Sequence, residues 1–149
     1  MSEHRVIQIA VPSTGEEEWM SLRDPVMSGC LGQGTRVAAF EKAFAQRHQV
    51  KNALATTSCT TALHFILVAM GIGPGDEVIV SAFTWVATAN AVVYCGAKPV
   101  FADVSTATYN IDPDDVCRRI TERTKAVIPV HLFGLCSDMH ILRSVITGN

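Results

Sequence analysis

Thr56-Thr57-Ser58-Cys59-Thr60-Thr61-Ala62-Leu63 is the stretch around which the rest of the chain can be arranged. It lies between a short apolar run at residues 53–55 and a helical apolar pattern that begins at Leu63, so the sequence predicts a turn from a strand into a helix. The first turn of a helix leaves backbone N–H groups unpaired and carries partial positive charge. With the added hydroxyls, this turn suits an anion such as a phosphate. Capping of the helix by its own hydroxyls explains the same residues.

The composition is that of one globular domain. The chain has 149 residues, of which 48% are hydrophobic, and this is enough apolar material for a core. The net charge of −2 and the scattered basic residues form no basic stripe, so we expect no nucleic-acid partner. The N-terminal apolar run is interrupted by Gln8 and Pro12, and the run at residues 85–97 is too short to span a bilayer. We therefore expect a cytoplasmic protein without a membrane partner.

The cysteines form no CxxC pair and are odd in number, which argues against a disulfide framework. We expect them to be reduced and mostly buried. They are Cys30, Cys59, Cys95, Cys117 and Cys136. Cys136 and His140 have the spacing of two ligands on a helix, but two ligands do not make a metal site, and no metal is predicted.

The N-terminal region contains a polar segment and a glycine-rich segment. Residues 13–22 are acidic and include Trp19, which is typical of a short helix or of an arm lying on another surface. Residues 25–34 follow as a flexible segment, in which Gly32 and Gly34 permit unusual backbone angles or a close approach to a ligand. An ordinary linker explains the same composition.

The remaining chain alternates between β and helical patterns. Strands are predicted at residues 52–55, 77–80, 99–103 and 125–132. Helices are predicted after a cap at Thr35, from Leu63 to Met70, over residues 85–94, after Asp112, and around residues 141–146. This alternation implies right-handed crossovers and a mainly parallel sheet. Ligands of such sheets bind at the carboxyl ends of the strands, where the turn at residues 56–62, the segment 81–85 and His131 would all lie.

Several short motifs follow one another in a recognisable order. They are Ser28-Gly29 with Gly32-x-Gly34, Phe40-Glu41-x-x-Phe44, Ser58-x-Thr60-x-Ala62-Leu63, Gly73-Pro74-Gly75-Asp76-Glu77-Val78-Ile79, Phe83-Thr84-Trp85-x-Ala87-Thr88-x-Asn90, and Ile128-Pro129-Val130-His131-Leu132-Phe133-Gly134. Together they resemble the N-terminal part of the DegT/DnrJ/EryC1/StrS aminotransferases. These are pyridoxal-phosphate (PLP) enzymes that aminate keto sugars carried on nucleotides. The resemblance runs from about Ser28 to Asp138.

The resemblance implies a fold class and a domain division. The chain would be α/β, the N-terminal portion of a fold-type-I PLP-dependent aminotransferase large domain, with a mainly parallel sheet flanked by helices. Residues 1–34 would form an N-terminal arm and a glycine-containing active-site segment. Residues 35–149 would form a partial large domain that is incomplete at its C-terminus.

The resemblance also assigns cofactor contacts. By motif position, Ser58, Cys59 and Thr60 would hold the phosphate of pyridoxal 5'-phosphate through backbone and hydroxyl groups. The ring of Trp85 would lie against the pyridine ring of the cofactor and keep water from it. A packed core tryptophan is the alternative for Trp85. A reactive thiol at the helix N-terminus is the alternative for Cys59.

Candidates on the substrate side are Gly32, Gly34 and His131. A structural, hydrogen-bonded histidine at a strand end explains His131 equally well.

Transamination needs a lysine that holds the cofactor as a Schiff base and a carboxylate that pairs with the pyridine nitrogen. By resemblance both lie beyond Asn149, so no catalytic residue is predicted within the chain. The lysines present are Lys42, Lys51, Lys98 and Lys125. All four are predicted to be solvated surface side chains.

Three functions follow from these patterns. By the resemblance, the chain is part of an enzyme that transfers an amino group from an amino acid, glutamate or glutamine, to a nucleotide-linked keto sugar. Such an enzyme would act as a homodimer in amino-sugar or polysaccharide biosynthesis, and this chain alone would be inactive. The alternatives are a non-catalytic phosphate- or nucleotide-binding module and a decayed remnant.

Overall fold

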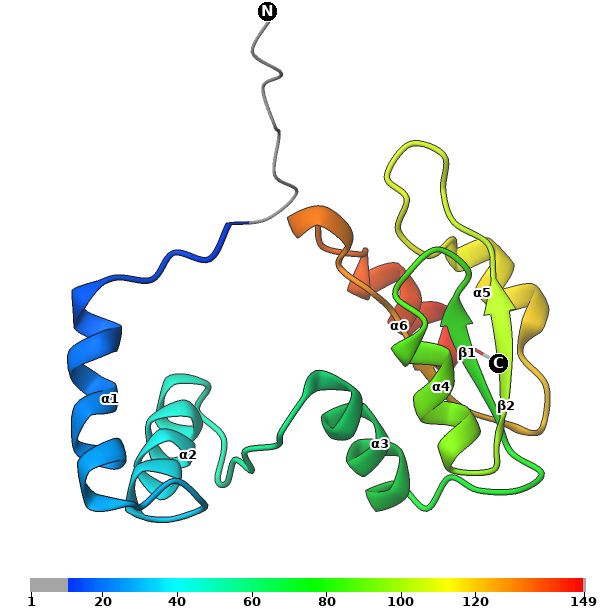
Figure 1. Ribbon diagram of the computed structural model, residues 1–149. Helices are drawn as coiled ribbons and strands as arrows, with labels where there is room; N and C mark the ends of the chain where they lie inside the picture. The colour runs from blue at the N-terminus through cyan, green and yellow to red at the C-terminus, as the bar shows by residue number, and fades with distance from the viewer. Residues whose placement is uncertain (1–10, 149) are drawn as a thin grey trace, which may run out of the picture. The chain divides into compact units, whose positions relative to one another are not determined.

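The computed structural model describes residues 11–148 of the chain (Figure 1). The spatial contacts between residues divide the chain into two compact units, Met1–Ala55 and Thr56–Asn149. The resemblance implies a boundary after residue 34 instead. The helix that follows Gly34 therefore shares a unit with the N-terminal helix, while the assignment of residues 35–149 to one domain of a larger fold stays a prediction.

The first unit contains two helices, α1 (Glu16–Ser28) and α2 (Thr35–Arg47). α1 starts with three glutamates near its positive end and stops at Gly29, whose φ of 69° is readily adopted by glycine. It is longer than the polar segment at residues 13–22 suggested, so part of the segment expected to be flexible is helical. α2 begins at the expected place, but its N-cap is Gly34 and not Thr35.

Residues 52–55 do not form the predicted strand. The backbone N–H of Ala55 donates to Oε1 of Glu41 in α2 at 2.8 Å, so a side chain takes the donor that a neighbouring strand would have used. A strand exists only where a second strand pairs with it, and no strand in residues 11–148 pairs with this segment.

The second unit is built on three parallel strands. They are β1 (Glu77–Ser81), β2 (Lys98–Ala102) and β3 (Thr124–Ile128), in the order β2-β1-β3. These correspond to three of the four predicted strands, and the mainly parallel sheet is confirmed. β2 lies on one side of β1 in the sheet, and β3 lies on the other side. Right-handed crossovers in these two directions put the helix between β1 and β2 and the helix between β2 and β3 on opposite faces of the sheet.

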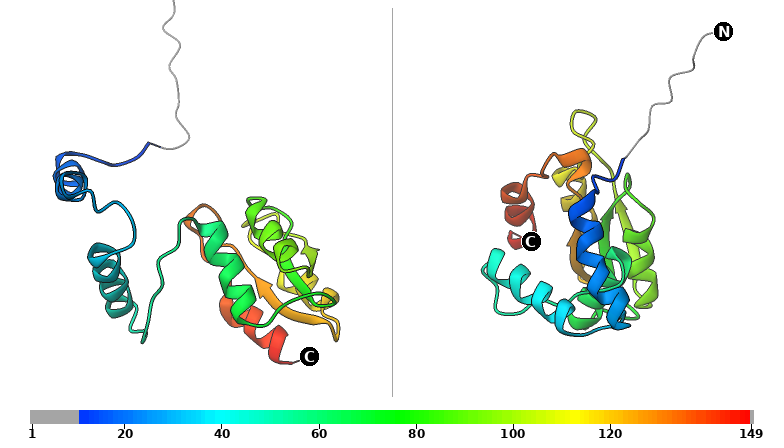
Figure 2. Two further views of the ribbon diagram at one scale, coloured as in Figure 1. Left: turned by 60° about the horizontal axis from the view of Figure 1, so that its bottom comes forward. Right: turned by 60° about the vertical axis from the view of Figure 1, so that its left-hand side comes forward.

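Four helices flank this sheet. They are α3 (Cys59–Ala69), α4 (Ala87–Tyr94), α5 (Pro113–Arg119) and α6 (Met139–Thr147), with a short 3-10 turn at Leu132–Gly134. α3 and α4 share one apolar cluster with the sheet, and α5 and α6 share another. Figure 2 shows α4 and α6 on opposite sides of the strands. None of the helices described for residues 11–148 has the length and apolar character needed to cross a bilayer.

The central strand β1 is buried along its whole length. Val78 and Val80 face the cluster that contains Leu67 of α3, whereas Ile79 faces the cluster that contains Leu142 of α6. This division follows the two-residue period of a strand. It also explains why the strand is apolar at consecutive positions, as is typical of parallel sheets covered on both faces.

A buried carboxylate stands at the amino end of β1. Glu77 is 3% exposed, and it accepts hydrogen bonds from Thr121 Oγ1 at 2.8 Å, Arg123 Nη2 at 2.9 Å and Lys98 Nζ at 3.2 Å. The hydrogen bond from Thr121, and then the bonds and charges of Lys98 and Arg123, lower the pKa of Glu77. These contacts tie β1 to β2 and to the segment that leads into β3.

A second buried carboxylate fastens α5 to the end of β2. Asp115 is 6% exposed and accepts the backbone N–H of Asp103 at 2.7 Å. Arg118 Nη2 at 3.0 Å and Arg119 Nε at 2.5 Å also donate to it. The bond from Asp103, followed by that from Arg119, lowers the pKa of Asp115 to about 2.

We expect Asp115→Asn to lower the free energy of unfolding at pH 7 by roughly 1–3 kcal/mol, because a charged acceptor of several hydrogen bonds is lost. The contribution is present above the ordinary pKa of 3.8 and is lost as the pH falls through about 2. Urea unfolding should therefore show a smaller difference from wild type at pH 3 than at pH 7. Asp114→Asn, at an exposed position of the same turn, is the control. Equal losses in the two variants would contradict this role of Asp115.

Candidate functional site

The hydroxyl-rich turn forms the N-terminus of α3. Ser58 is the N-cap, and its Oγ accepts the backbone N–H of Thr61 at 3.1 Å. The Ser58 carbonyl accepts the N–H of Ala62 at 3.0 Å. The capping interpretation is therefore confirmed for Ser58. The N–H groups of Cys59 and Thr60 remain without an acceptor among residues 11–148.

The surroundings of these two N–H groups favour an anion. No acidic side chain lies in the first turn of α3, so nothing there neutralises the positive end of the helix. Thr61 Oγ1 lies 2.9 Å from Ser58 Oγ and 3.5 Å from Thr57 Oγ1, which gathers three hydroxyls at the turn. Two backbone donors and these hydroxyls are a donor set that can bind a phosphate.

Trp85 lies in the segment between β1 and α4, and its side chain is 78% exposed. The alternative of a packed core tryptophan is therefore wrong. Its carbonyl accepts the N–H of Thr88 at 3.1 Å, which fixes the backbone at the start of α4. α4 begins at Ala87, two residues later than predicted. The tryptophan therefore stays outside the helix, where its ring is available for stacking.

The turn before α3 and the segment before α4 lie at the same edge of the second unit. Leu67 of α3 packs with Ala91 and Val92 of α4. Figure 1 shows the two helices side by side, with both N-termini at the end toward which the strands point. This is the carboxyl edge of the sheet, where parallel α/β folds bind ligands.

His131 follows β3 at this edge and is exposed. Its Nδ1 accepts the backbone N–H of Ser137 at 3.0 Å, and Ser137 Oγ donates to the Val130 carbonyl at 2.9 Å. The hydrogen-bonded, structural role of His131 is thus present in the structure. Its Nε2 has no partner within residues 11–148, so the substrate role stays a prediction.

Gly32 and Gly34 belong to the first unit and lie on the segment between α1 and α2. A side chain at Gly32 would meet open space, and Gly34 has an extended backbone with a φ of −178°. With Ser28 and Cys30 they line a hollow of about 250 Å³. Neither position requires glycine for its own backbone angles, and their role toward a substrate stays a prediction.

The cysteines do not follow the prediction of burial. Cys30, Cys59, Cys117 and Cys136 are exposed, and Cys95 is half-buried. The prediction was wrong because the buried positions of the core are taken by aliphatic side chains, while these cysteines lie at helix ends, on outer helix faces and in loops. Burial raises the pKa of Cys95. Cys136 and His140 are not joined by a third ligand-type side chain in residues 11–148 to form a metal site.

Asn110 is a residue that the sequence did not single out. It is 5% exposed, its Nδ2 donates to the Leu135 carbonyl at 3.0 Å, and its Oδ1 accepts the N–H of Leu132 at 3.0 Å. It therefore holds the segment after β3 from a loop that follows β2. No local pattern signals this role, because the partners lie 22 and 25 residues further along the chain.

Comparison with known proteins identifies the family. Residues 12–148 match the DegT/DnrJ/EryC1/StrS aminotransferase family. The chain belongs to this family. The resemblance stated from the motifs is thereby confirmed.

Two relatives carry names from sugar metabolism. The spore coat polysaccharide biosynthesis protein SpsC of Bacillus subtilis (strain 168) is 46% identical over 91% of this chain and 35% of its own length. GDP-perosamine synthase of Caulobacter vibrioides is 55% identical over 93% of this chain and 38% of its own length. The chain thus spans little more than a third of the relatives it matches.

Solved structures of aminotransferases have the same fold. The PLP-form of Spr1654 from Streptococcus pneumoniae superposes with a TM-score of 0.88 at 34% identity, over 93% of this chain and 36% of that protein. 3-Amino-5-hydroxybenzoic acid synthase superposes with a TM-score of 0.84 at 40% identity, over 93% and 37%. The predicted fold class, the N-terminal portion of a PLP-dependent aminotransferase, is confirmed.

We expect Ser58→Ala to lower the free energy of unfolding by about 1 kcal/mol, because the Thr61 N–H loses its acceptor. Thr60→Val is the matched control, since the Thr60 hydroxyl has no partner among the described residues. It should remain within about 0.5 kcal/mol of wild type. Urea unfolding of the 149-residue chain measures both. A loss in Thr60→Val as large as that in Ser58→Ala would argue against the assigned cap.

Proposed function

We propose that the chain is the N-terminal part of an enzyme that uses pyridoxal 5'-phosphate to move an amino group from an amino acid, glutamate or glutamine, to a nucleotide-linked keto sugar. The open N-terminus of α3, with two backbone donors and no nearby carboxylate, is the observation that carries the proposal. The names of the relatives, GDP-perosamine synthase and a spore coat polysaccharide protein, support a sugar substrate and a role in amino-sugar or polysaccharide biosynthesis. By family resemblance, the full-length enzyme would act as a homodimer.

The phosphate end of the cofactor fits the donors at α3. The N–H groups of Cys59 and Thr60 would each donate to a phosphate oxygen, and the positive helix end would favour the phosphate charge. Ser58 contributes indirectly, because its cap on Thr61 holds the first turn in shape. The free hydroxyl of Thr60 adds a further donor.

The ring of the cofactor fits the exposed side chain of Trp85. Stacking would fix the plane of the ring and exclude water from one of its faces. When bound, the cofactor supplies an electron sink that allows an amino group to pass between an amino acid and a carbonyl compound.

The lysines of the second unit lie at the wrong edge for this chemistry. Lys98 is the first residue of β2 and its Nζ pairs with Glu77, while Lys125 is the second residue of β3. Both therefore stand near the amino ends of the strands, opposite the carboxyl edge. We propose that the lysine and the carboxylate that complete the reaction come from outside these 149 residues, and that the chain alone is inactive.

A non-catalytic binding module is the second candidate function. The same observation supports it: the open backbone donors at α3 lie within the second unit, whereas both lysines of that unit lie near the opposite edge of the sheet. Cofactor binding without any transfer of an amino group is the result that this function predicts.

A titration with pyridoxal phosphate tests the phosphate site. Cys59→Pro removes one backbone donor at the first position of α3, where proline is tolerated after the extended Ser58. We expect it to weaken binding by about 10- to 100-fold, the value of a hydrogen bond to a charged group. Cys59→Ala keeps the N–H and should bind as wild type does. Equal affinities of the two variants would exclude this backbone contact.

Reduction of the titrated sample with borohydride, followed by peptide mapping, tests the position of the lysine. The proposal expects no lysine to be labelled. A label confined to one lysine would show that the chain carries its own reactive amine.

We expect Trp85→Ala to weaken binding of pyridoxal phosphate by about 1–3 kcal/mol, because a large aromatic contact is lost. Competition by inorganic phosphate should be unchanged in this variant, since phosphate has no ring to stack. Trp19→Ala, at an exposed tryptophan of α1, is the matched control. An unchanged affinity in Trp85→Ala would show that this ring does not contact the cofactor.

A further inference from the structure

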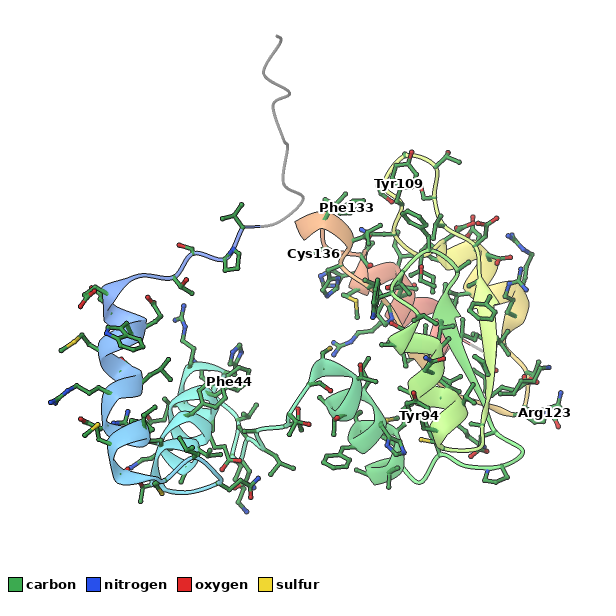
Figure 3. All side chains as sticks on the ribbon, in the orientation of Figure 1. Phe44, Tyr94, Tyr109, Arg123, Phe133 and Cys136 are labelled. Atoms are coloured by element: carbon green, nitrogen blue, oxygen red, sulfur yellow. The ribbon has the colours of Figure 1, made fainter. Side chains whose placement is uncertain are left out.

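The segment after β3 has an unusual backbone that is held at several points. Phe133 has a φ of 52°, and Gly134 has a φ of 87°. A left-handed backbone is strained for phenylalanine, and its side chain, 87% exposed, gains no burial in return. Since burial of the Phe133 side chain does not compensate this strain, the contacts of the flanking residues must hold the backbone in this conformation. Figure 3 shows Phe133 and Tyr109 near one end of the unit and Arg123 near the other.

The buried amide of Asn110 provides two of these contacts. It bonds the N–H of Leu132 and the carbonyl of Leu135, which lie on either side of the strained pair. The two partners also fix the orientation of the amide, because an N–H can only donate and a carbonyl can only accept. Any rotation of the amide would break both bonds at once.

Ser137, which follows this segment, fixes the ring of His131. The backbone N–H of Ser137 points at Nδ1 of His131 at 3.0 Å. Since a backbone N–H can only donate, Nδ1 must carry no proton, and the neutral ring carries its proton on Nε2. This Nε2–H has no acceptor among residues 11–148 and belongs to an exposed side chain at the carboxyl edge.

We propose that Asn110 is a positioning residue that, by holding residues 132–135, fixes His131 as an Nε2–H donor toward an oxygen atom of the ligand bound at the carboxyl edge. The inference rests on the proposed function, because it needs a ligand at this edge. The fixed orientation of the His131 ring does not depend on that ligand. The oxygen could belong to pyridoxal phosphate or to the nucleotide of the sugar substrate. Nδ1 then serves the fold, and Nε2 serves binding.

The form of the His131 ring is measured by NMR on the 149-residue chain labelled with 15N-histidine. Correlations between ring protons and nitrogens report which nitrogen carries the proton. We expect His131, assigned by its absence in His131→Asn, to be in the Nε2–H form, whereas exposed His140 should average between both forms. Averaging of His131 in the wild-type chain would overturn the proposal.

Variants of Asn110 test the positioning. Asn110→Ala removes both bonds to the segment, and Asn110→Asp, which serves if the alanine variant does not fold, removes the donor to Leu135. Each should shift His131 toward averaging. Asn52→Asp, at an exposed position of the first unit, is the control for the added charge. A folded Asn110 variant with an unchanged His131 ring would overturn the role of Asn110.

Two substitutions of His131 test the roles of its two ring nitrogens separately. The side-chain oxygen of His131→Asn can accept from Ser137 in place of Nδ1, but nothing replaces Nε2–H. His131→Gln reaches the position of Nε2 and leaves Ser137 without its acceptor. We expect His131→Asn to keep the wild-type unfolding midpoint while its affinity for one probe falls about 3- to 10-fold. His131→Gln should lower the midpoint instead.

The binding probes are pyridoxal phosphate and GDP. Weaker binding of the first by His131→Asn assigns the acceptor to the cofactor, and weaker binding of the second assigns it to the nucleotide. Unchanged affinity for both would limit His131 to the fold and overturn the proposal. If wild-type protein binds neither probe, the proposed function and the ligand contact both fail, and the ring form still decides whether Asn110 positions His131.

Discussion

The burial of β1 on both faces is the constraint on which the second unit depends. Val78 and Val80 contribute to one core and Ile79 to the other, so the strand cannot slip by one residue without exchanging its faces. β2 and β3 pair with it in parallel on either side. Parallel strands need crossover connections, and these bring the loops after all three strands to one edge. The candidate site exists at that edge because the core requires this topology.

The turn at α3 is capped by Ser58 and still has backbone donors available to an anion. Ser58 caps the helix, and capping leaves the N–H groups of Cys59 and Thr60 open at the start of the first turn. A capped helix start is therefore compatible with anion binding, since the cap uses only one of the early donors. The capping and anion-binding interpretations of this turn are therefore compatible with one geometry.

The sequence predicted those features that local patterns determine. The continuous apolar residues of β1 and the Asp112-Pro113 helix start both identified their elements correctly. Residues 52–55 were wrongly predicted as a strand, because strand pairing depends on a distant partner that composition does not reveal. The buried roles of Glu77 and Asn110 were missed for the same reason, since their partners lie 21 or more residues away. Trp85 was placed at the correct edge by topology, whereas its exposure required the structure.

The buried cluster around Glu77 joins the strands at the edge opposite the candidate site. Contacts that hold the sheet together there share no residue with the loops that follow the strands. Substitutions in those loops therefore leave the Glu77 cluster and its pairing of the strands intact. The candidate-site edge has stabilising contacts of its own, in the cap at Ser58 and in the bond from the Asp103 N–H to Asp115, so tolerance to substitution there differs from one loop position to the next.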